Sequence, residues 1–99
     1  MTISSRIPTP QAQRYLQQLS KHWSHKFEVN FSAEQSQIEL PLGTVLMNAG
    51  DNALIVELRP ESEASRDKLQ SVLEEHLDRF AHKEGGLAYD WQETPVKTS

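Results

Sequence analysis

Histidine is the residue type with the most scope for chemistry here, since four occur among 99 residues and cysteine is absent. His22 and His25 lie three residues apart near the end of a predicted helix, and His76 lies in the apolar stripe of a second one. Side chains three apart are neighbours on a helix surface, so both could reach one ion. Imidazole nitrogens suit zinc, iron and copper. One interpretation is therefore a zinc or iron site built from His22, His25 and His76, with Glu75 as a further candidate ligand.

The same histidines also have ordinary structural explanations. A histidine on an apolar helical stripe is commonly a packed side chain, and a histidine near a helix C-terminus interacts favourably with the helix dipole. The pair His22 and His25 also differs from the zincin motif, whose histidines are four apart. A third interpretation is a pH-responsive contact between His22 and His76, should the two helices pack side by side. We favour structural histidines and therefore expect no cofactor.

The other residue types do not form a recognisable catalytic motif. No serine has a nucleophile-elbow motif around it, and the adjacent carboxylates Glu74 and Glu75 point about 100° apart on a helix. The missing cysteines exclude disulfides, iron–sulfur clusters and cysteine nucleophiles. We therefore expect a binding protein rather than an enzyme, with a small enzyme of unrecognised site as an alternative.

Charge is unevenly distributed along the chain. The overall net charge of −4 argues against a nucleic-acid partner. Residues 1–26 carry four bases and no acid, whereas residues 27–99 carry six bases and 14 acids, a net charge of −8. One interpretation is a small basic face for an anionic partner; the residues proposed to form it are Arg14, Lys21, His22, His25 and Lys26. The alternative is that helix dipoles and local solvation explain the asymmetry.

The elements that must position these residues follow from periodicity. Apolar residues three and four apart predict two amphipathic helices, one from Thr9-Pro10 to about Lys26 and one from the Ser62 cap to Gly85-Gly86. Alternating apolar residues predict strands, and the polar segment 48–52 predicts a hairpin turn. The predicted strands are 2–7, 27–31, 38–42, 44–49, 53–59 and 87–91.

This order predicts an α+β fold in two layers, with both helices on one face of an antiparallel sheet of five to six strands. Residues 1–92 would form a single domain and residues 93–99 a flexible tail. No long apolar run occurs, so we expect neither a membrane span nor a secretory leader. The expectation is a cytoplasmic monomer or weak dimer.

Five short segments of the sequence form a recognisable set: Arg14-Tyr15-Leu16, Lys21-His22-Trp23-Ser24-His25-Lys26, Leu42-Gly43-Thr44, His76-Leu77-Asp78-Arg79-Phe80-Ala81 and Asp90-Trp91. With these segments the chain resembles a bacterial domain-of-unknown-function family numbered 2218. The resemblance spans about Ile3 to Gln92, and Gly85-Gly86 departs from the family's pattern in the connection between residues 83 and 88.

The resemblance implies a small stand-alone bacterial protein with a two-layer domain of the TATA-binding-protein type. It implies no established activity, and it implies an accessory role in iron or siderophore handling, beside flavin-dependent ferric-siderophore reductases. That context would favour a metal or chelate at His22, His25 and His76.

Overall fold

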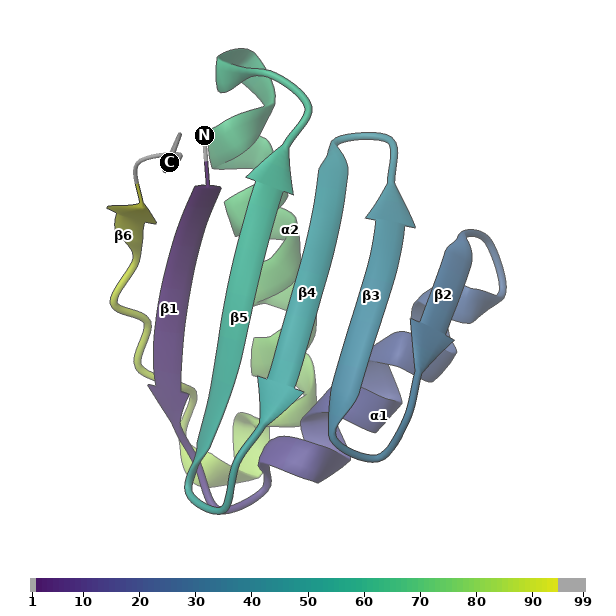
Figure 1. Ribbon diagram of the computed structural model, residues 1–99. Helices are drawn as coiled ribbons and strands as arrows, with labels where there is room; N and C mark the ends of the chain where they lie inside the picture. The colour runs from purple at the N-terminus through teal and green to yellow at the C-terminus, as the bar shows by residue number, and fades with distance from the viewer. Residues whose placement is uncertain (1, 95–99) are drawn as a thin grey trace.

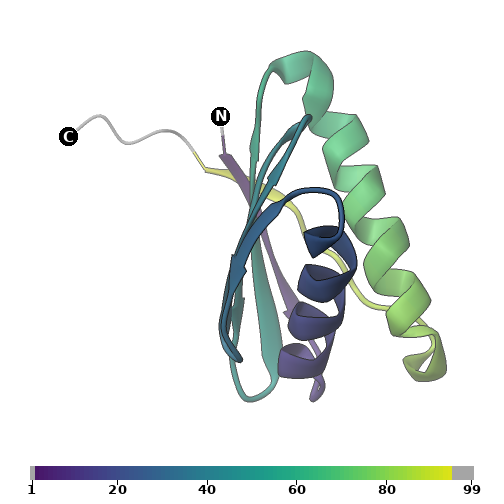
Figure 2. The same cartoon turned by 90° about the vertical axis from the view of Figure 1, so that its right-hand side faces the viewer.

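The computed structural model describes residues 2–94, which form a six-stranded antiparallel sheet with two helices on one face (Figures 1 and 2). The predicted α+β architecture and element order are confirmed. Spatially, the strands are ordered β2-β3-β4-β5-β1-β6, so the first strand lies between the fifth and the sixth. The elements are β1 Thr2–Pro8, α1 Ala12–Ser24, β2 Glu28–Phe31, β3 Gln35–Leu40, β4 Gly43–Ala49, β5 Ala53–Pro60, α2 Glu63–Phe80 and β6 Gln92–Thr94, with a short 3-10 helix, η1, at His82–Glu84.

The β4–β5 hairpin follows the predicted pattern, whereas both ends of β3 differ from it. The β4–β5 turn lies within the predicted segment 48–52, and Gly50 donates its N–H to the carbonyl of Ala53. The predicted strand 38–42 lies too far along the chain, because β3 begins at Gln35 and Leu40 is already paired with Gly43. Pro41 and Leu42 therefore form the β3–β4 turn, where proline costs no ladder hydrogen bond. The alternating Leu42 extended the predicted strand two residues too far.

The first helix begins later than Thr9-Pro10. Gln11 occupies the N-cap position and makes no side-chain cap hydrogen bond. The Thr9 hydroxyl instead accepts the Gln11 N–H at 3.1 Å within the turn that precedes the helix. At the other end α1 finishes at Ser24, and the N–H groups of Lys26 and Phe27 bond back to the Trp23 carbonyl. Both ends are thus two to three residues inside the predicted range.

The second helix has the predicted cap and a different end. Ser62 is the N-cap, and its side chain accepts the Ser65 N–H. The helix ends at Phe80, and η1 follows before Gly85, whose φ of 80° lies in the left-handed region that favours glycine. The Gly85-Gly86 stop therefore terminates the short η1 turn rather than α2 itself.

The last predicted strand is wrong. Residues 87–91 run alongside the sheet without joining it, and the sheet gains β6 at Gln92–Thr94 instead, paired with β1. Glu93 and Thr94, predicted as part of a flexible tail, belong to this strand. The remaining predicted tail, residues 95–99, lies outside the described residues.

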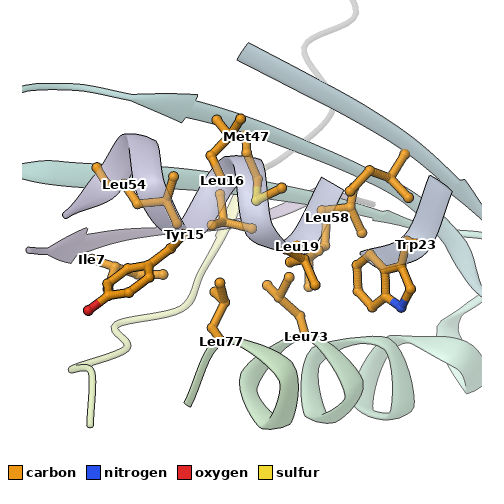
Figure 3. Packing of buried hydrophobic residues seen from close by; sticks show 14 of the residues in the cluster. Ile7, Tyr15, Leu16, Leu19, Trp23, Met47, Leu54, Leu58, Leu73 and Leu77 are labelled. Carbon is orange, nitrogen blue, oxygen red and sulfur yellow. The ribbon is translucent and has the colours of Figure 1, made fainter. Parts of the chain in front are cut away.

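The core lies between the sheet and the two helices (Figure 3). Tyr15, Leu16, Leu19 and Trp23 of α1 are all buried, as their three- and four-residue spacing predicts. They pack with residues of the sheet and of α2 that are also buried, among them Ile7, Met47, Leu54, Leu58, Leu73 and Leu77. This burial fixes α1 with its opposite side turned to solvent.

No described helix covers the other face of the sheet (Figure 2). Its side chains are largely polar and exposed, with Ile55 as an exposed apolar residue. Neither described helix is sufficiently long and apolar to cross a membrane.

Candidate functional site

The outer side of α1 carries a row of polar and basic side chains. Arg14, Gln18 and Lys21 follow at intervals of four and three residues, which places them on one helix face. All five residues of the predicted basic face are exposed at the surface. The exposed members are Arg14, Lys21, His22, His25 and Lys26.

Two of these residues line an open groove of about 550 Å³. Arg14 and Lys21 line it from α1, and Gly50 and Asp51 line it from the β4–β5 turn. A hydrogen bond of 2.9 Å from the Thr9 N–H to the Asn52 carbonyl holds this turn beside the start of the helix. The remaining lining residues are Pro10, Gln11, Gln13, Gln17 and Gln18. His22, His25 and Lys26 are not among them.

The cations of this groove have no acidic partner. Among the side chains that the structure describes, ion pairs join Arg59 to Glu57 and Arg66 to Asp67 and Glu93. Arg14 and Lys21 form none with a described carboxylate, and Asp51 is the acidic residue of the groove. Neither groove cation is therefore paired with a carboxylate that the structure describes.

A second polar group of the groove also lacks a partner. The Oε1 atom of Gln18 is buried and accepts no hydrogen bond from the described residues. A buried acceptor that has lost water without gaining a donor is energetically unfavourable. Because this oxygen is shielded from solvent, a donor on a ligand reaches it only when the Gln18 amide turns toward the groove.

The structure brings two of the predicted metal ligands together and leaves the third apart. The rings of His22 and His76 meet across the α1–α2 contact, with centres 5.2 Å apart. His76 also lies 5.0 Å from the ring of Trp23. His25 is exposed at the end of α1, and within residues 2–94 no group of three His, Asp or Glu side chains is placed to hold an ion. The predicted three-histidine arrangement is therefore absent as a cluster, while the predicted meeting of His22 and His76 is present.

A hydroxyl–carboxylate contact at the start of α1 has no counterpart in the sequence analysis. Glu84 of η1 accepts hydrogen bonds from the hydroxyls of Thr9 and Tyr15. Burial, followed by the hydrogen bond and charge of Glu84, raises the pKa of Tyr15 above its usual value. The partners are 69 and 75 residues apart, so no local pattern could have revealed them. The contact anchors η1 to α1.

The aromatic residues after η1 pack against α2 rather than around a pocket. Tyr89 and Trp91 stack with ring centres 6.1 Å apart. The Trp91 indole N–H donates to Glu74 at 2.6 Å, and the Tyr89 hydroxyl donates to Asp78 at 3.0 Å. Burial and the neighbouring Asp78 raise the pKa of Tyr89. These contacts hold residues 87–91 against α2.

The chain is similar to proteins of known structure and to a bacterial family. A family model described as "Uncharacterized protein conserved in bacteria (DUF2218)" matches residues 4–92. The NMR structure of PA4090 from Pseudomonas aeruginosa has 32% sequence identity and a TM-score of 0.76 to this chain, covering 98% of each. None of the curated proteins matches the sequence. The family match spans most of the chain, so this protein belongs to the uncharacterised bacterial family DUF2218.

Proposed function

We propose that this protein is a non-enzymatic binding protein that acts in the cytoplasm and holds an anionic small molecule on the outer face of α1. The observation that carries the proposal is the pair of unneutralised cations, Arg14 and Lys21, in one groove. A guanidinium and an ammonium on the same wall favour carboxylate, phenolate or phosphate oxygens. Catalysis is not proposed because the groove's lining holds neither a histidine nor a paired acid and base.

The neutral lining narrows the chemistry of the ligand. Gln17 and Gln18 offer amide donors and acceptors, and the buried Gln18 Oε1 requires a donor. Asp51 adds a carboxylate that accepts hydrogen bonds at the side of the β4–β5 turn. The best match is an anion that also carries hydroxyl donors, such as a hydroxycarboxylate or its ferric chelate. This class includes the ferric siderophores that the family resemblance suggests.

The size and openness of the groove set the expected affinity. A volume of about 550 Å³ suits a molecule of small-ligand size. The groove is polar and open to solvent, so apolar burial contributes little and charge is screened by salt. We expect dissociation constants from tens of micromolar to millimolar, with affinity falling as ionic strength rises.

Calorimetric titration with citrate, ferric citrate and inorganic phosphate tests the proposal. The Arg14→Glu, Lys21→Glu double variant should weaken binding of citrate or ferric citrate by more than about tenfold, since it reverses both groove charges. Both side chains are exposed, so folding should be unaffected.

Lys26→Glu is the matched control for the single variant Lys21→Glu, because it makes the same charge change on an exposed residue outside the groove lining. It should change the affinity by less than about threefold. Equal losses of affinity in Lys26→Glu and Lys21→Glu would show that the anion binds to a diffuse basic surface rather than in the groove. A large acidic protein partner would use such a surface. Unchanged affinity in the double variant would refute the proposal.

A further inference from the structure

We propose that His22 and His76 form a two-nitrogen site for a divalent transition-metal ion between α1 and α2. The proposal is independent of the anion-binding groove, whose lining contains neither histidine. It rests on three features: the separation of the two rings, the hydrogen bond that fixes one of them, and the ligand types nearby.

The ring separation matches two imidazoles that share one ion. Zinc–imidazole bonds are about 2.0–2.1 Å long, and each ligating nitrogen lies about 1.1 Å from its ring centre, so tetrahedral geometry separates two ring centres by about 5 Å. The ring centres of His22 and His76 are 5.2 Å apart and tilted by 53°. The two helices therefore already hold the rings at the spacing that an ion requires.

One ring is already prepared as a ligand. The Nδ1 atom of His76 lies 2.7 Å from the Val72 carbonyl oxygen, which can only accept a hydrogen bond. Nδ1 must therefore carry the proton, and in the neutral ring the lone pair is on Nε2. Metal-binding histidines commonly donate their second nitrogen to a backbone carbonyl in this way. Contact with Trp23, 5.0 Å away, further restricts the ring.

The ring of His22 makes the proposed metal site accessible from solvent. His22 is exposed, and neither of its ring nitrogens nor Nε2 of His76 is hydrogen-bonded to a described residue. An ion held between the rings would therefore keep water in its remaining positions. Desolvation on binding is consequently limited.

The nearby ligand types determine which ions fit. No carboxylate joins the two rings in a group of three among the described residues, so the oxygen-seeking ions Mg²⁺ and Ca²⁺ are disfavoured. Imidazole favours Cu²⁺, Ni²⁺ and Zn²⁺, with Cu²⁺ bound most tightly. With two protein ligands rather than three or four, we expect micromolar rather than nanomolar affinity.

Zn²⁺ titration followed by NMR tests the site. The ring signals of His22 and His76 should shift together and saturate, and the indole N–H of Trp23 should shift with them. The rings of His25 and His82 and the indole of Trp91 serve as internal controls and should move little. Equal shifts of all four histidines, or no shift at sub-millimolar Zn²⁺, would overturn the proposal.

Single substitutions identify the ligands. His22→Gln and His76→Gln should each weaken Zn²⁺ binding by at least about tenfold, whereas His25→Gln and His82→Gln should change it less than about twofold. His22 is exposed, so His22→Gln decides the matter even if His76→Gln disturbs packing. Equal losses in His22→Gln and His25→Gln would overturn the two-residue site.

Discussion

Gly43 shows how one residue permits the central sheet. It pairs with Leu40 in the β3–β4 hairpin and with Pro60 of β5, and its φ is 147°. A Cβ at this position would lie 2.3 Å from the carbonyl oxygen of Arg59, so a side chain cannot fit without moving the backbone. The glycine that looks like a strand breaker in the sequence therefore allows two strands to approach closely.

Gly43→Ala should lower the free energy of unfolding by about 2 kcal/mol or more, since it adds a clash to a strained φ. Gly50→Ala is the control, because its Cβ would meet nothing nearer than 3.5 Å and its φ is not positive. It should cost less than about 1 kcal/mol. Urea unfolding measures both, and similar losses in the two variants would contradict this account of Gly43.

Ionisation of Tyr15 should destabilise the folded protein at alkaline pH. Burial and Glu84 raise the pKa of Tyr15 in the folded protein, so the unfolded chain ionises first as pH rises. The stabilisation is complete below the unfolded pKa of about 10 and is lost as pH rises through the folded value. Unfolding by urea between pH 8 and 11 should show this decline, and Tyr15→Phe should make it shallower. An identical decline in Tyr15→Phe would contradict the assignment.

At the scale of elements, residues 87–91 are held by side-chain contacts before the chain joins the sheet as β6. The Asp90 N–H donates to the buried Ser5 hydroxyl at 2.9 Å, and Trp91 donates to Glu74 of α2. These contacts place β6 beside β1. The segment therefore connects the helical layer to the sheet edge.

Trp91→Ala should release this segment, because it removes both the stacking with Tyr89 and the donor to Glu74. Amide hydrogen exchange should then accelerate at β6, by a factor of about ten if the local free energy of opening falls by about 1.4 kcal/mol. The amides that form hydrogen bonds between β4 and β5 should stay protected. Uniform acceleration across the sheet would show instead that Trp91 supports the whole fold.

The elements that sequence predicts well are those with a local signal. The predicted apolar stripe of α2 and the predicted turn at 48–52 are both present in the structure. The predicted strand 87–91 fails because the alternation of Tyr89 and Trp91 reflects packing on α2, which mimics a strand pattern. The meeting of His22 and His76 follows from packing two apolar stripes together. The groove could not be predicted, because Asp51 reaches it from a distant turn.

At the scale of the whole molecule, charge is segregated along the chain. The first 26 residues carry all the groove cations and no acid, and the rest of the chain has a net charge of −8. Because α1 lies on the helical face, its cations are displayed to solvent there while the core beneath it is apolar. The basic surface is thus small and local on an acidic protein.

This layout predicts that an anion binds locally despite the overall negative charge. Affinity for citrate should fall steadily as NaCl rises from low to physiological concentration, where the Debye length shortens to about 8 Å. Glucose, which has hydroxyls without charge, serves as the neutral control in the same titrations. Citrate affinity that is independent of salt would contradict an electrostatic role for Arg14 and Lys21.

The central claim is that the groove beside α1 binds anions, and amide chemical-shift mapping with citrate tests it most directly. The account predicts saturable shifts at residues that line the groove, above all Arg14, Gln18, Lys21 and Asp51, with little change on the open face of the sheet around Ile55. Those shifts should disappear in the Arg14→Glu, Lys21→Glu variant. Shifts centred elsewhere, or unchanged in that variant, would contradict it.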